Sequence, residues 1–111
     1  MTITEERAGN IIILSLDGRL DTQTAAQVEQ QLLAAVDEKP TGLVLDCTQL
    51  SYVSSVGLRV IVLVSKRLAT AQGRLALCGL SESMLRVFNL VGLGNWGNIH
   101  PSREAAIASL T

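Results

Sequence analysis

The feature that most constrains this chain is the alternation of short aliphatic runs with longer segments whose apolar residues recur at helical intervals. The short runs cover residues 11–16, 43–45 and 75–78, and the longer segments cover residues 25–36 and 56–71. Short continuous aliphatic runs are typical of buried strands, and the longer pattern is typical of helices with one buried face. Parallel neighbouring strands need such a helix to connect them. The order therefore predicts an α/β fold.

Turn and cap residues set the expected boundaries. Gly9-Asn10 predicts a hairpin that joins a short N-terminal strand to the run 11–16, and Asp17-Gly18 is expected to end that second strand. Asp21 or Thr22 can cap the first long helix, and Lys39-Pro40-Thr41-Gly42 ends it.

The segment 56–71 is ambiguous, because its Val60–Val64 run has the β-branched composition of a strand. Its length favours a helix, which Ser54 or Ser55 can cap and Gln72-Gly73 ends. Leu58, Ile61, Leu68 and Ala71 are expected to face the sheet.

The C-terminal third predicts a strand over 74–78, a short helix over 82–90 capped by Ser81, a loop over 92–97, a short strand over 98–100 and a last helix opened by Ser102. We therefore expect a mixed, mostly parallel sheet of about four to five strands packed with about four helices. With 111 residues, the chain is expected to form one domain, 1–111.

Composition excludes several classes of function. The net charge is -1 and the nine lysines and arginines are scattered, so no nucleic-acid surface is expected. No apolar run approaches the ~20 residues of a membrane span, and the polar N-terminus lacks the regions of a signal peptide. Cys47 and Cys78 are interpreted as buried free thiols, which suits a reducing compartment, so we expect a cytoplasmic protein.

Motifs for catalysis are missing. The sequence has no phosphate-binding loop, no dinucleotide-binding glycine motif and no nucleophile elbow. Asp17, Asp21 and Asp46 follow strands or precede a helix, where capping explains them better than a carboxylate site. His100, next to Pro101, is interpreted as a surface or turn histidine, and the glycines of 92–97 as turn residues. We expect no enzyme, no cofactor and no metal site.

One segment stands out. Ser54-Ser55 lies where a strand-to-helix loop becomes a helix N-terminus, whose free N–H groups and positive dipole end tolerate a phosphate. The alternative is that either serine only caps the helix.

The same helix has a second, largely apolar stripe that is rotated away from the sheet. It consists of Val56, Val60, Leu63 and Arg67. Either a neighbouring helix covers this stripe or a partner protein does, and we favour the partner.

Three motifs carry a resemblance to a known family: GRLD at 18–21, LVLD at 43–46 with Leu50, and YVSSVGLR at 52–59. With the C-terminal part from Leu85 to Ala106, they resemble the STAS family of bacterial anti-sigma-factor antagonists over nearly the whole chain. The resemblance places the phosphorylated serine on Ser55, with Ser54 as a possible secondary acceptor. Gly57 matches the glycine that lets the helix start pack closely. The partner-binding residues that we assign are Asp21, Ser54, Val56, Gly57, Arg59, Val60 and Leu63.

The resemblance implies a competition between protein partners. The unphosphorylated antagonist binds an anti-sigma factor that is also a serine kinase of the histidine-kinase ATPase fold, and sigma factor is released. Phosphorylation ends the binding and a PP2C-type phosphatase restores it. The chain is expected to be a monomer or weak dimer without a sensory or membrane domain. The alternative is a non-switching STAS interaction subunit of a lipid-transport or secretion-control complex, with Ser55 only as a cap.

Overall fold

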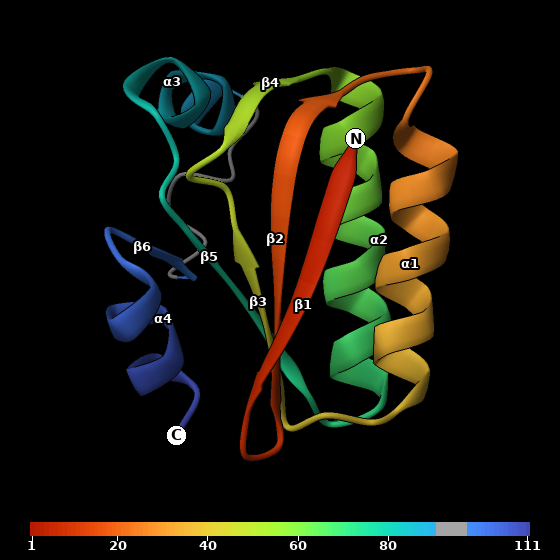
Figure 1. Ribbon diagram of the computed structural model, residues 1–111, viewed down its shortest axis with the longest axis vertical. Coiled ribbons are helices and arrows are strands. Elements are labelled where there is room, and N and C mark those ends of the chain that lie inside the picture. Colours follow the sequence, from red (N-terminus) through yellow and green to blue (C-terminus); the bar gives the residue numbers. More distant parts are fainter. Residues whose placement is uncertain (91–97) are drawn as a thin grey trace.

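The computed structural model describes residues 1–90 and 98–111, and shows a sheet with helices on both faces (Figure 1). Its elements in chain order are β1 (Thr2–Ala8), β2 (Ile11–Leu20), α1 (Ala25–Asp37), β3 (Gly42–Asp46), β4 (Leu50–Val53), α2 (Ser55–Thr70), β5 (Arg74–Cys78), α3 (Glu82–Leu90), β6 (Ile99–His100) and α4 (Arg103–Ser109). The mixed α/β fold, the hairpin, the helical state of α2 and the last short strand are as predicted. The expected loop over 92–97 lies outside the described residues.

The six described strands exceed the expected four to five by one. Their order is β1-β2-β3-β5-β6, with β4 pairing with β2 off this path. Only β1 is antiparallel to its neighbour. The parallel strands follow from the crossovers through α1 and α2, because a helix returns the chain to the end from which it started.

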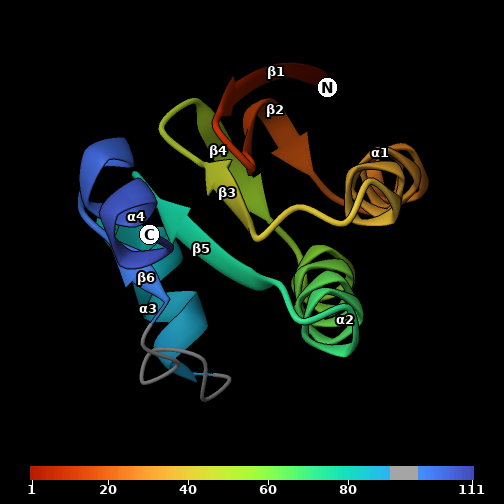
Figure 2. The same ribbon diagram turned by 90° about the horizontal axis from the view of Figure 1, so that it is seen from below.

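The sheet separates two cores, as the view along its strands shows (Figure 2). Helices α1 and α2 lie together on one face, where Leu32, Leu45 and Ile61 belong to the larger cluster of buried side chains. Phe88 of α3 belongs to the same cluster. On the other face, α4 covers a smaller cluster with Ala106 and Leu110.

The predicted end of β2 was wrong. Asp17-Gly18 does not end the strand, which continues to Leu20. The register shifts between Gly18 and Arg19, and Gly18 has a φ of +126°, so the strand kinks there and leaves β3 to pair with β4. This irregularity allows the four-residue strand β4 to pair with the end of β2. The sequence analysis did not predict this strand.

The start of α1 also differs from the prediction. Thr24 is the N-cap, and its side chain makes no capping hydrogen bond. The Asp21 carboxylate accepts instead from the backbone N–H groups of Gln23 and Thr24, at 3.0 and 3.3 Å. Asp21 therefore stabilises the turn before the helix.

Both cysteines are free and buried, as predicted. Cys47 belongs to the core under α1 and α2, and Cys78 to the core under α4, so their side chains lie on opposite faces of the sheet. Burial raises the pKa of the Cys47 thiol far above its usual range and that of Cys78 to about 11. Both groups therefore remain thiols at neutral pH.

Arg103, the first residue of α4, connects that helix to three strands. Its guanidinium donates to Asp46 of β3 at 3.0 and 3.1 Å, to Glu6 of β1 at 2.9 Å and to Ser15 of β2 at 2.9 Å. Burial opposes ionisation of Asp46, but hydrogen bonds from Thr48 and from Arg103 outweigh it and hold the pKa of this carboxyl below its ordinary value. Asp46 thus links the turn at Thr48 and helix α4 to the end of β3.

We predict that Asp46→Asn lowers the free energy of unfolding at pH 7 by about 2 kcal/mol, the usual scale for hydrogen bonds to a charged group. A lowered folded-state pKa stabilises the fold at pH values above the ordinary carboxyl value of 3.8. The difference from the unsubstituted protein should therefore disappear as the pH falls through the folded-state pKa. Urea unfolding between pH 2 and pH 7 measures it.

The matched control is Asp17→Asn, the same chemical change at an exposed position of β2. It should change stability by less than about 0.5 kcal/mol. Equal losses in the two variants at pH 7 would contradict the assigned role of Asp46.

Candidate functional site: the N-terminus of α2

The two serines at the start of α2 have different roles. Ser54 is the N-cap, and its Oγ accepts from the backbone N–H of Gly57 at 3.2 Å. Ser55 is the first residue of the helix and is exposed. The sequence left the cap open between the two, and the structure assigns it to Ser54. The Ser55 side chain is accessible at the positive end of the helix dipole.

Close packing fixes the position of this helix start. The Ser54 N–H donates to the carbonyl of Leu20 at the end of β2, at 2.9 Å. A Cβ on Gly57 would lie 2.6 Å from Leu20 Cγ and 3.0 Å from Val53 Cγ2. Any larger residue would push the helix away from the sheet. Gly57 is buried, so its contribution to a site is close packing, as the resemblance implied.

A charged and aromatic cluster lies on the strand ends beside this turn. Arg19 of β2 and Tyr52 of β4 are register partners, and the guanidinium lies 4.4 Å from the centre of the Tyr52 ring. Arg19 also lies 3.6 Å from the Asp21 carboxylate. Hydrogen bonds from Gln23 and Thr24, together with the charge of Arg19, lower the pKa of Asp21. Tyr52 is 42% exposed, so the face of the cluster is accessible.

The predicted apolar stripe of α2 is partly covered. Val60 is only 5% exposed and belongs to the core, which contradicts its predicted exposure. The reason is α1, which packs along α2 on the same face of the sheet (Figure 2). Val56 and Leu63 remain half-buried, and Arg67 is exposed farther along the helix. Ala71, expected to face the sheet, is instead the exposed C-cap.

What remains of this stripe is a groove between α1 and α2 of about 470 Å³. It is lined by Thr22, Ala25, Ala26, Glu29, Val56, Arg59, Val60 and Leu63. Four of the seven predicted partner-binding residues therefore meet in one groove: Val56, Arg59, Val60 and Leu63. Asp21 and Ser54 lie at the turns that lead into the two helices, and Gly57 is buried against Leu20 and Val53 at the strand ends.

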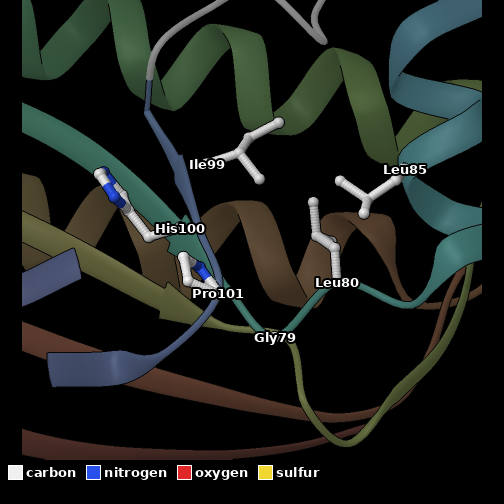
Figure 3. A pocket seen from close by; sticks show the side chains of 6 residues that line it. All are labelled: Gly79, Leu80, Leu85, Ile99, His100 and Pro101. Carbon is white, nitrogen blue, oxygen red and sulfur yellow. The ribbon is translucent and has the colours of Figure 1, made fainter. Parts of the chain in front are cut away.

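A second pocket, of about 400 Å³, lies at the C-terminal end of β5 and contacts Gly79 and Pro101. Figure 3 shows the side chains of Leu80, Leu85 and Ile99 pointing toward one another, whereas the His100 ring turns away from them. These three side chains offer hydrophobic surface only. His100 is a half-buried strand residue, contrary to the prediction of a surface or turn position, and its Nε2 is buried without a hydrogen-bond partner among residues 1–90 and 98–111.

No helix in the parts of the chain that the structure describes is long and apolar enough to cross a membrane. Residues 1–90 and 98–111 also contain no group of three or more histidine, cysteine, aspartate or glutamate side chains placed to hold a metal ion.

Comparison with known proteins identifies the family. The model of the STAS domain matches residues 2–106. The chain belongs to the STAS domain family. BtrV of Bordetella bronchiseptica, whose name describes an anti-sigma factor antagonist, is 38% identical over 109 residues, which cover 98% of this chain and 94% of BtrV.

Solved structures agree with the STAS assignment. The crystal structure of an anti-sigma factor antagonist from Mycobacterium paratuberculosis superposes with a TM-score of 0.89 at 25% identity, covering 98% of this chain and 92% of that one. SpoIIAA of Bacillus in its phosphorylated form shares the fold, with a TM-score of 0.76 at 24% identity and coverage of 99% and 100%.

The sequence analysis did not select three residues of this surface as site residues: Arg19, Tyr52 and Glu29. Arg19 and Tyr52 come together only through the pairing of β2 with β4, and β4 was not predicted. Glu29 enters the groove because α1 lies beside α2, a placement that no motif indicates.

We predict that Ser54→Ala lowers the free energy of unfolding by about 1 kcal/mol, because it removes the cap of α2. Ser55→Ala should change it by less than about 0.5 kcal/mol, because the capping oxygen belongs to Ser54. Thermal unfolding of both variants at one pH measures the difference. A larger loss for Ser55→Ala than for Ser54→Ala would reverse the assignment of the cap.

Proposed function

We propose that this STAS protein is an anti-sigma-factor antagonist that switches partners through phosphorylation of Ser55. The unphosphorylated form binds an anti-sigma factor that is also a serine kinase of the histidine-kinase ATPase fold, and thereby releases sigma factor. A PP2C-type phosphatase reverses the modification. We place this cycle in the cytoplasm.

The observation that carries the proposal is that the two serines have different structural roles. Ser54 caps α2, so Ser55 has no capping role; it is exposed and directly precedes Val56, which lines the groove between α1 and α2. The alternative, a non-switching subunit of a lipid-transport or secretion-control complex, explained Ser55 as a cap. That explanation now applies to Ser54, which favours the switch.

The chemistry of the switch requires no catalytic group on this chain. The kinase transfers the γ-phosphoryl group of ATP: the bond from Ser55 Oγ to phosphorus forms and the bond from phosphorus to the leaving oxygen of ADP breaks. The serine proton passes to a base of the kinase, and ADP leaves with the electron pair. The name of the phosphorylated SpoIIAA structure shows that a protein of this fold carries such a modification.

Electrostatics explains how the phosphate acts on binding without unfolding the protein. It adds about -1.5 to -2 charges at pH 7. The positive end of the α2 dipole tolerates this charge within the fold. In an interface, however, the charge must be desolvated beside the half-buried Val56, which opposes association.

We predict that Ser55→Asp weakens binding to the cognate kinase by about 100-fold or more, while its melting temperature changes little. Ser55→Ala should bind like the unsubstituted protein and accept no phosphate. Isothermal titration with the purified cognate kinase, together with mass spectrometry after incubation with ATP, measures both effects. Phosphate found only on Ser54, or full binding by Ser55→Asp, would overturn the proposal.

The groove gives a matched pair of controls. Leu63→Asp introduces a charge into the half-buried groove and should abolish binding with a modest loss of stability, whereas Gln30→Asp introduces the same charge at an exposed position of α1 outside the groove lining. Gln30→Asp should bind normally. Normal binding by Leu63→Asp would move the interface away from α2.

A further inference from the structure

Arg59 lies one helical turn after Ser55 on the same face of α2. The two are the first and fifth residues of the helix, and side chains four positions apart are neighbours on a helix surface. Helical side chains also lean toward the N-terminus, so a long side chain at position 59 can reach position 55. Both residues are exposed.

The described residues leave the Arg59 charge available. The first turn of α2 contains no acidic residue, and among residues 1–90 and 98–111 the ion pairs involve Arg7, Arg19 and Arg103 and not Arg59. Arg59 instead lines the groove between α1 and α2, where Glu29 contributes the acidic side chain of α1. The groove thus has a cation beside its apolar floor.

A phosphate on Ser55 would find this cation within its own helix. Phosphoserine offers three strong acceptor oxygens, and a guanidinium pairs with phosphate through two parallel hydrogen bonds. An acidic group four residues before a basic one is also the favourable orientation for a pair on a helix.

We propose that Arg59 holds the phosphate of Ser55 in an intrahelical ion pair, so that phosphorylation withdraws the cation of the groove as well as adding a charge. The inference rests on the proposed function for the identity of the acceptor serine. It also indicates the chemistry of the partner: a segment with an apolar side chain for Val56 and Leu63 and an acidic side chain for Arg59.

The test uses phosphoserine installed at position 55 during translation, so that it depends on no kinase. The probe is the ³¹P resonance of this phosphoserine, titrated with pH in the Arg59 protein, in Arg59→Gln and in Arg59→Lys. The helix dipole and the acids Asp21 and Glu29 are present in all three proteins, so a difference between them isolates residue 59. The control is Arg67→Gln, the same charge removal two turns farther along α2.

We expect the second pKa of the phosphoserine, ordinarily about 6, to lie about 0.5 units lower with Arg59 than with glutamine, which corresponds to about threefold weaker proton binding. Arg59→Lys should recover part of the shift, Arg67→Gln should retain all of it, and the shift should shrink in 1 M salt. Equal pKa values in the Arg59 protein and Arg59→Gln would overturn the inference. The measured pKa does not depend on partner binding. The ion pair can therefore be absent while the proposed switch holds, and the ion pair can be present while the proposed switch fails.

Discussion

The close approach of the first turn of α2 to the ends of β2 and β4 is the constraint on which the site depends. At position 57 only glycine fits, because a Cβ there would collide with the side chains of Leu20 and Val53. The backbone N–H of Ser54 also donates a hydrogen bond to the carbonyl of Leu20. The helix start is thereby fixed to the sheet. The Ser54 side chain caps it by accepting a hydrogen bond from the backbone N–H of Gly57. A residue placed just after that cap is rigidly held and accessible, which suits a position that a kinase and a phosphatase would recognise in the proposed switch.

The sequence predicts much of this arrangement because its signals are local. A serine before an apolar helical pattern predicts a helix start, and the run Leu43–Leu45 predicts a buried strand. The sequence could not predict β4, because its four residues pair with β2 only where Gly18 kinks that strand. For the same reason, the contact between Arg19 and Tyr52 was not foreseen.

Side-chain exposure on α2 was the other prediction that required tertiary information. Periodicity separates two stripes of the helix, with Ala71 as an exception, but it does not say how far α1 covers the second. Val60 is buried by that helix, whereas Leu63 remains at the surface of the groove. Arg103 illustrates a similar limit, since its partners Asp46 and Glu6 are 57 and 97 residues away in the sequence. Such contacts follow from the topology and not from spacing.

The central claim is that the partner binds across the N-terminus of α2 and the groove beside it. Amide hydrogen exchange of the unphosphorylated protein, alone and saturated with the anti-sigma kinase proposed as its partner, tests this claim most directly. We expect added protection in residues 20–29 and 54–63 and unchanged exchange in α4. Protection concentrated on α4 or β6, with the start of α2 exchanging as in the free protein, would contradict it.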